Sequence, residues 1–326
     1  FFLSLKTKPF VLLAGISGTG KTKLVELFSQ AIGYELNIIP VKPDWNDISD
    51  LLGYNNIEGK FIEGPLYKVL KEANGNPKEG YIVCLDEMNL ARVEYYFSDI
   101  LSRMETKNKE IDLSGEKIEL PSNLYIVGTV NMDETTHPFS KKVLDRANTI
   151  EFSNVKLNQL PFDIKNDNEY EKLNLDNSFL NSKYKRLIDC EDKYHSFIKD
   201  QVVSKLVQIN SILKKSNLHI GYRIRDEICF YMLYNKKYDL MSFEKALDYQ
   251  MMQKILPRIQ GSSQSIKELL IKLFEFFTVK IERDEYKILK EMEKVLDSEM
   301  KYPMSTQKVY YMFKNYKEDG FTAYWL

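Results

Sequence analysis

A glycine-rich segment with one lysine is the first feature of this sequence that could do chemistry. Residues 15–22 read Gly-Ile-Ser-Gly-Thr-Gly-Lys-Thr and fit the pattern G-x-x-x-x-G-K-[ST]. They follow the apolar run Phe10–Ala14 and lead into an amphipathic stretch that starts at Lys21. A Gly-rich turn with a chance Lys-Thr pair would lack this strand-then-helix context. The segment therefore predicts a loop that binds the phosphates of a nucleotide.

Each residue type in this loop has a defined role in binding the phosphates of a nucleotide. Glycines let backbone N–H groups wrap the phosphates, and the positive end of the following helix favours their negative charge. Lys21 would reach the β- and γ-phosphates, and the Thr22 hydroxyl would ligate Mg²⁺. We expect the nucleotide to be surrounded by Gly15, Ser17, Gly18, Thr19, Gly20, Lys21, Thr22 and Lys23.

Two acids end a second apolar run further along the chain. Asp86 and Glu87 directly follow Tyr81–Leu85. A strand that ends in acids is common on its own, so its interpretation depends on the phosphate-binding loop. With that loop present, we expect Asp86 to lie near the magnesium ion and Glu87 to orient and activate the attacking water.

Two further polar residues stand at the C-terminal ends of apolar segments. Asn131 follows Leu124–Val130 and would lie at the edge of an α/β sheet where ligands bind. It could hold the water or the γ-phosphate, or it could be a solvated amide at a strand end. Arg146 closes the segment Lys142-Val-Leu-Asp-Arg. It could pair with an acid on its own helix, or it could reach the γ-phosphate bound by a neighbouring subunit.

These residues need a scaffold in which strands and helices alternate. The pattern over residues 1–153 predicts a three-layer α/β domain with a parallel sheet covered by helices. Strands are expected at Phe10–Ala14, Leu36–Val41, Tyr81–Leu85, Leu124–Val130 and Asn148–Phe152. Helices are expected at Lys21–Ile32, Leu66–Ala73, Val93–Met104 and Ser140–Arg146, with a β-hairpin over Ile111–Leu120.

The rest of the chain has a different pattern. Residues 154–182 are polar and lack a clear period, which indicates a connector or an insertion. Residues 183–326 predict an α-helical domain. Its helices are expected near Tyr194–Lys215, Arg225–Tyr234, Phe243–Ile255, Ile266–Phe277 and Asp284–Asp297.

Charge and composition limit the partners and the location. The net charge of -1 gives no global attraction to nucleic acid, so a DNA contact would need a local basic surface or a partner. Neither a membrane-spanning run of about 20 apolar residues nor a secretory leader is evident, so we expect a cytoplasmic protein. Because the chain opens on Phe1 directly before the first strand, we also expect an N-terminal domain that is absent here.

Cysteine and histidine supply no metal site by their spacing. The cysteines are odd in number and far apart, which predicts neither a disulfide framework nor a zinc site. The histidines have no ligand spacing. These residues are Cys84, Cys190, Cys229, His137, His195 and His219. The one metal expected is Mg²⁺, held through Thr22 and Asp86 together with the phosphates.

The order of these motifs resembles the AAA+ superfamily. That resemblance covers the phosphate-binding loop, the acid-ended strand, the strand ending in Asn131, the segment ending in Arg146 and the helical domain after them. It implies a sheet order of 5-1-4-3-2, with Asn131 between Lys21 and Glu87, and an α-helical lid. It also implies a ring, most commonly a hexamer, in which Arg146 acts across a subunit boundary.

Within that superfamily the chain resembles the MoxR, midasin and McrB branch. Residues 51–66 resemble the insertion around the second helix of that branch, and residues 86–91 resemble the Asp-Glu-Ile-Asn-Arg-Ala segment of McrB. The second match adds Asn89 to the expected catalytic residues. A looser match over residues 221–223 and 254–258 of the lid implies that Arg223 contacts the nucleotide, although an arginine at a helix start is often a surface residue.

The chain departs from the McrB pattern at two places that bear on the base. Leu90 stands where McrB has Arg, and residues 130–137 read Val-Asn-Met-Asp-Glu-Thr-Thr-His where McrB reads Met-Asn-Thr-Ala-Asp-Arg. The resemblance favours GTP and leaves ATP as the alternative. The phosphate-binding chemistry itself is indifferent to the base.

The resemblance implies a motor that hydrolyses GTP or ATP with Mg²⁺ and drives translocation of double-stranded DNA for a McrC-like nuclease in restriction and phage defence. No nuclease motif is convincing within this chain, so cleavage would belong to the partner. A MoxR-like ATPase that remodels proteins is the alternative. A nucleotide-gated switch with negligible turnover is disfavoured, because the chain carries all the groups for hydrolysis.

Overall fold

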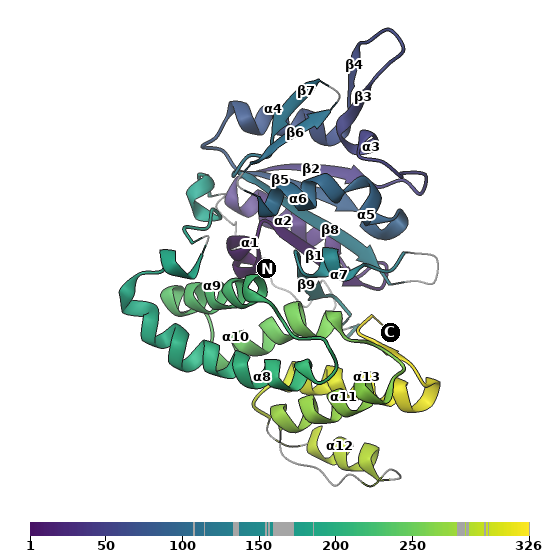
Figure 1. Ribbon diagram of the computed structural model, residues 1–326. Coiled ribbons are helices and arrows are strands. Elements are labelled where there is room, and N and C mark those ends of the chain that lie inside the picture. The colour runs from purple at the N-terminus through teal and green to yellow at the C-terminus, as the bar shows by residue number, and fades with distance from the viewer. Residues whose placement is uncertain are drawn as a thin grey trace. The chain divides into compact units, whose positions relative to one another are not determined.

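The chain divides into two compact units, Phe1–Ser182 and Lys183–Leu326. Figure 1 shows the computed structural model with its helices and strands labelled. The structure describes residues 1–106, 108–113, 115–132, 137–153, 155, 157–158, 173–184, 186–278, 284, 287–296, 298 and 300–325.

A five-stranded parallel sheet forms the centre of the first unit. Its order is β2-β5-β8-β1-β9, and every neighbouring pair of strands is parallel. Numbered along the chain, these strands give the order 5-1-4-3-2, which confirms the expected fold. The strands are β1 (Phe10–Gly15), β2 (Glu35–Pro40), β5 (Tyr81–Asp86), β8 (Leu124–Asn131) and β9 (Asn148–Glu151).

The inner strands are apolar on both faces because helices cover both faces. Val11 and Leu13 of β1 point into a core shared with Val25 of α2 (Lys21–Ile32) and with Leu5. Phe10, one residue out of phase, packs on the opposite face, where its ring centroid lies 5.4 Å from that of Phe97. Two-sided burial is the usual state of a parallel strand and gives the three layers that were predicted.

Several elements of this unit differ from the expectation. The expected helix Val93–Met104 is interrupted at Phe97, whose backbone leaves the helical region (φ -117°, ψ 4°). A helix, α1, precedes β1 in a segment for which no element was predicted. The remaining elements are α1 (Phe2–Thr7), α3 (Ser49–Leu52), α4 (Pro65–Gly75), η1 (Met88–Leu90), α5 (Val93–Tyr96), α6 (Ser98–Glu105) and α7 (Lys141–Leu144).

Two hairpins extend from the sheet layer. The hairpin of β6 (Glu110–Leu113) and β7 (Glu116–Glu119) confirms the one predicted over Ile111–Leu120. A second hairpin joins β3 (Gly53–Asn55) and β4 (Phe61–Glu63) inside the segment that resembles an insertion. Gly53 begins it with φ +114°, and a Cβ there would lie 2.2 Å from the Ile62 carbonyl oxygen, so the close approach of the two strands at this point requires glycine.

The last residues of the first unit are tied to its core. Residues 154, 156 and 159–172 of the expected connector lie outside the described residues. After them, the backbone N–H groups of Leu173 and Leu175 donate to the carbonyls of Ala31 and Ile32 at the end of α2. The buried ammonium of Lys6 donates to the carbonyls of Ser178, Phe179 and Asn181 at 3.0, 2.7 and 3.0 Å. The Tyr125 hydroxyl also donates to Asn177 Oδ1 at 2.7 Å, in the short helix η3 (Asn177–Phe179).

The second unit is helical, as predicted. Asp248 caps α13 by accepting from the backbone N–H groups of Met304 and Ser305. The sequence did not predict α13 or the short β10–β11 pair. The elements are η4 (Leu187–Asp189), η5 (Asp192–Tyr194), π-helix η6 (Phe197–Val203), α8 (Ser204–Lys214), α9 (Tyr222–Tyr238), α10 (Phe243–Gln250), π-helix η7 (Met251–Ile255), η8 (Leu256–Arg258), β10 (Gln260–Gly261), α11 (Gln264–Phe277), α12 (Ile288–Leu296), α13 (Pro303–Asp319) and β11 (Thr322–Ala323).

Among the described residues of both units, no helix combines the length and apolar character that crossing a bilayer demands.

The Lys6 contacts predict a measurable contribution to stability. Lys6→Met keeps the length of the side chain but leaves three carbonyls without their ammonium donor, so we expect a loss of about 2–3 kcal/mol in the free energy of unfolding. Lys68→Met, at an exposed position of α4, should change it by less than about 0.5 kcal/mol. Denaturant unfolding followed by circular dichroism compares the two variants. Equal, small effects would show that the three contacts contribute little.

Candidate nucleotide-binding site

The predicted phosphate-binding loop connects β1 to the start of α2. Gly18 and Gly20 have positive φ angles of 78° and 87°, and a Cβ at either position would meet nothing within 4 Å. The backbone conformation, not crowding, therefore requires glycine at these positions. No side chain caps the start of α2. Its first N–H groups are thus available to a ligand, at the end of the helix that favours negative charge.

Lys21 is buried beneath this loop, with 6% of its surface exposed. Its Nζ donates to the carbonyl oxygens of Gly15 at 3.0 Å and Ile16 at 2.8 Å. Burial lowers the pKa of Lys21, and the negative charges of Asp86 and Glu87 oppose that shift. A phosphate oxygen would be a stronger acceptor for this ammonium than the two neutral carbonyls, because it carries charge.

Asp86 joins the loop to the neighbouring strands. Its Oδ1 accepts a hydrogen bond of 2.8 Å from the Thr22 hydroxyl and another of 2.8 Å from the Thr129 hydroxyl. Thr22 and Asp86 thus lie together, as the predicted magnesium site requires. Mg²⁺ is commonly held by one or two protein groups together with substrate phosphates and water. The oxygen donors at this point fit that requirement.

Glu87 and Asn131 are in direct contact at the same edge of the sheet. Asn131 Nδ2 donates to Glu87 Oε1 at 2.8 Å. Behind them, Asn89 Nδ2 donates to the backbone oxygen of Asn131 at 2.8 Å, and Asn89 is buried. Glu87 and Asn131 therefore occupy positions from which they can contact a bound nucleotide, whereas Asn89 supports the end of β8.

These residues line a hollow of about 250 Å³. It contains the loop, both acids and the end of β8, which the sequence had predicted to meet. When bound, Mg²⁺ would neutralise phosphate charge and polarise the bond to the γ-phosphate. The lining residues are Ser17, Gly18, Thr19, Gly20, Lys21, Thr22, Lys23, Asp86, Glu87, Thr129 and Asn131.

Of the two predicted arginines, Arg146 does not line this hollow, and the contact of Arg223 with a nucleotide stays a prediction. Arg146 lies beyond the end of α7, which stops at Leu144 and not at Arg146 as expected. Its Nη1 donates to the Lys142 carbonyl at 2.8 Å, and it forms no ion pair with any residue that the structure describes. An ion pair with Asp145 on its own helix is therefore not observed. Arg223 belongs to the second unit, where it is the second residue of α9.

Thr129 is the site residue that the sequence reasoning missed. It is 2% exposed, and its hydroxyl contacts both Asp86 and the backbone of Glu87. A signal was present, because Thr129 and Asn131 are two apart and so share one face of an otherwise apolar strand. Interpreting it would have required the register of β8 against β5, which pairs Leu85 with Gly128 and so places Thr129 beside Asp86.

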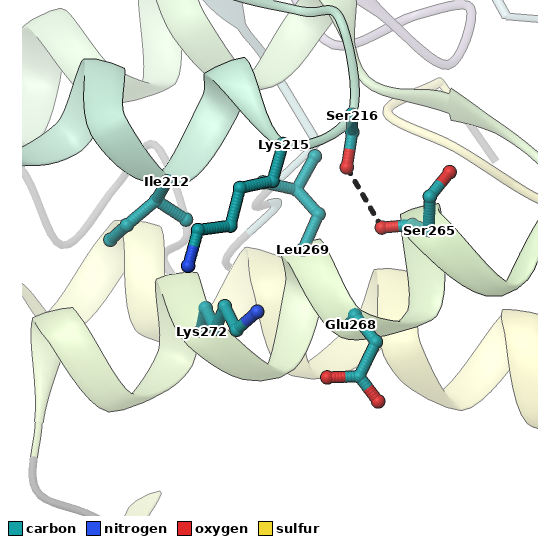
Figure 2. Close-up of a pocket in the computed structure, with 7 residues that line it drawn as sticks. All are labelled: Ile212, Lys215, Ser216, Ser265, Glu268, Leu269 and Lys272. Carbon is teal, nitrogen blue, oxygen red and sulfur yellow. Dashed lines mark hydrogen bonds between the residues drawn. The ribbon is translucent and has the colours of Figure 1, made fainter.

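The second unit has a hollow of about 230 Å³ between α8 and α11 (Figure 2). Lys215 and Lys272 line it, and the Ser216 hydroxyl donates to the Ser265 backbone oxygen at 2.8 Å. Its lining contains neither a glycine loop nor a pair of carboxylates, so it lacks the groups that hold magnesium and a triphosphate. Among the described residues, no cluster of three or more His, Cys, Asp or Glu side chains could hold a metal ion.

Comparisons with known proteins agree with this geometry. Residues 10–147 match the family described as the AAA domain of the dynein-related subfamily, and residues 169–321 match a domain of unknown function, DUF8727. The crystal structure of a proposed ATPase from Cytophaga hutchinsonii is similar over 79% of each chain, with a TM-score of 0.50 and 17% identity. At that identity the similarity concerns the fold alone.

Curated relatives match over a shorter part of the chain. Uncharacterized proteins of Staphylococcus aureus strains USA300 and NCTC 8325 are 35% identical over 92 residues, which is 26% of this chain. The match spans 32% of the relatives' own length. The family match over residues 10–147 and the fold of the first unit support a nucleotide-binding domain of the AAA+ ATPase type.

The site predicts that binding and turnover can be separated by mutation. Lys21→Ala should abolish tight triphosphate binding, because it removes the buried cation that faces the phosphates. Glu87→Gln should bind normally but lose turnover, because only the water-activating carboxylate changes. Nucleotide affinity and steady-state hydrolysis are measured side by side, with the exposed Lys68→Ala as a control that should retain both. Normal turnover in Glu87→Gln would contradict the assignment.

Proposed function

We propose that this chain is a ring-forming nucleoside triphosphatase that drives DNA translocation for a partner nuclease, in a restriction and phage-defence system of the McrBC kind. The observation that carries the hydrolytic part is the contact between Glu87 and Asn131 at 2.8 Å, at the edge of the hollow that contains Lys21. A general base and a polar amide at this edge are what attack on a γ-phosphate needs.

The residues of this chain divide the work of hydrolysis among them. The loop N–H groups and Lys21 bind the β- and γ-phosphates and offset the charge that develops as the bond breaks. Glu87 accepts a proton from the attacking water and orients its lone pair toward phosphorus. Asn131, which holds Glu87 by a hydrogen bond, would turn its amide to the γ-phosphate or the water when these are present. Nucleotide binding would therefore release the Glu87 carboxylate from its hydrogen bond with Asn131.

The finer assignment to a DNA motor rests on resemblance. Residues 51–66 and 86–91 resemble segments of the McrB branch, and the first segment forms the β3–β4 hairpin. The partners that this implies are further copies of the chain in a hexamer, double-stranded DNA and a McrC-like nuclease. The same residues are compatible with a MoxR-like ATPase that remodels proteins, which is the second candidate.

The macromolecule that stimulates turnover distinguishes these candidates. A DNA motor should hydrolyse faster with double-stranded DNA and a McrC-like nuclease, whereas a remodelling ATPase should respond to a folded protein client and ignore DNA.

The choice of base is a separate prediction. GTP is expected to bind more tightly than ATP on the resemblance to McrB alone, since the residues that line the hollow suit phosphates and do not distinguish the base. Competition of each triphosphate against a fluorescent analogue measures the ratio of the two dissociation constants. A large preference for ATP would favour the MoxR-like candidate and leave the roles of Lys21 and Glu87 unchanged.

Assembly generates a prediction about Arg146. Arg146 does not line the hollow of its own chain, and the resemblance to AAA+ domains implies that it meets a γ-phosphate across a subunit boundary. Such contacts repeat around a closed ring. Arg146→Ala should bind nucleotide nearly normally and hydrolyse it on the order of a thousandfold more slowly.

Mixing variants tests whether that arginine acts between chains. Arg146→Ala and Glu87→Gln should each be inactive alone, and a mixture should recover part of the activity at boundaries that pair an intact Arg146 with an intact Glu87. Full activity of wild-type monomers at every protein concentration would rule out the ring.

A further inference from the structure

We propose that Thr129 is a positioning residue of this site: its hydroxyl sets the orientation of both Asp86 and Glu87 for magnesium-dependent triphosphate binding and hydrolysis. This inference rests on the proposed hydrolytic function. It concerns a single hydroxyl that bridges the side chain of one acid and the backbone of the next.

The hydroxyl of Thr129 both donates and accepts a hydrogen bond. It donates to Asp86 Oδ1 at 2.8 Å and accepts from the backbone N–H of Glu87 at 2.8 Å. A threonine hydroxyl has one proton to give and lone pairs to receive, so both bonds can exist together. Thr129 is 2% exposed, so water cannot readily replace either bond.

The first bond determines which oxygen of Asp86 faces the ligand. Thr22 and Thr129 both donate to Oδ1, so that oxygen is held on the side of the loop and of β8. These two hydrogen bonds restrict rotation of the Asp86 carboxylate. Oδ2 is then left for the metal ion or for a water bound to it. Without the Thr129 hydroxyl, one of the two restraints on that rotation is lost. Partners that orient a metal ligand in this way commonly affect metal affinity as much as function.

The second bond holds Glu87 in an unfavourable backbone conformation. Glu87 has φ 54° and ψ 48°, the left-handed region that costs a non-glycine residue on the order of 1–2 kcal/mol. Its N–H is anchored by Thr129, and its side chain is held by Asn131. Because Thr129 and Asn131 lie on one face of β8, that strand fixes both the backbone and the carboxylate of the general base. The turn at Glu87 directs the carboxylate into the hollow, and Thr129 supports the turn.

Packing alone does not explain a threonine at this position. A valine would fill the same volume in a buried strand, and an unbonded hydroxyl there is costly. Thr149 on β9 provides the comparison within this sheet. It is 1% exposed, and its hydroxyl has no hydrogen-bond partner among the described residues. The two buried threonines therefore differ in the bonds that their hydroxyls make, which supplies a matched control.

The test compares Thr129→Val, Thr129→Ser and Thr149→Val in the full chain. Binding of a fluorescent, non-hydrolysable triphosphate is titrated with Mg²⁺, and turnover is measured separately. Thr129→Val should raise the Mg²⁺ concentration for half-maximal binding and lower turnover, each by about 10- to 100-fold. Thr129→Ser, which keeps the hydroxyl, should restore both to within about threefold of wild type. Thr149→Val should match wild type in both assays.

Two results would overturn the proposal. One is a wild-type Mg²⁺ dependence in Thr129→Val, and the other is an equal loss in the Val and Ser variants, which would indicate packing. If Thr129→Val does not fold, as judged by circular dichroism, Thr129→Ala removes the hydroxyl without filling its space and must show the same Mg²⁺ shift. A wild-type chain that binds Mg²⁺-triphosphate without hydrolysing it would refute the proposed function, yet the Mg²⁺ titration would still test Thr129.

Discussion

The parallel pairing of β1, β8 and β5 is the constraint on which the candidate site depends. Gly15 pairs with Asn131, and Leu85 pairs with Gly128, so the three strands end at one edge of the sheet. The loop, the two acids and the amide come from segments far apart in the sequence. This pairing brings Thr22 within hydrogen-bond distance of Asp86, and Asn131 within hydrogen-bond distance of Glu87, in the hollow that Lys21 also lines.

Hydrogen bonds across that edge connect the ends of neighbouring strands into one network. Asp86 at the end of β5 accepts hydrogen bonds from Thr22 of the loop and from Thr129 of β8. Asn131, also on β8, donates to Glu87. Because every step is about 2.8 Å and mostly buried, displacement of one member disturbs the others. A ligand that binds Lys21 and Thr22 can therefore be sensed at Glu87 without a large change of the fold.

The sequence predicted the site best where residues of catalytic types stand directly at the ends of strands. The loop from Gly15 to Thr22, the acids after β5 and Asn131 were all predicted, because a local pattern sets both their conformation and their role. The sheet order was predicted only through resemblance to AAA+ proteins, since strand pairing is not local. Thr129 was missed because its role depends on the register of β8 against β5, which neither a local pattern nor the sheet order gives.

Other differences have local physical causes that the pattern did not reveal. The break at Phe97 occurs within an apolar helical pattern, and that side chain packs against Phe10. In the second unit, α13 begins at Pro303, and its first N–H groups are bound by Asp248, more than fifty residues earlier in the chain. The buried pair of Glu227 and Lys254 likewise joins α9 to η7 and could not be deduced from spacing. Distant partners of this kind specify a fold without leaving a periodic signal.

The most direct test of the account is phosphate release by the purified wild-type chain. With a saturating triphosphate, the account predicts continuous release of inorganic phosphate that requires Mg²⁺, stops when the ion is chelated and does not occur with the diphosphate. Tight binding of Mg²⁺ and triphosphate with no release beyond the background rate, at every protein concentration, would contradict it.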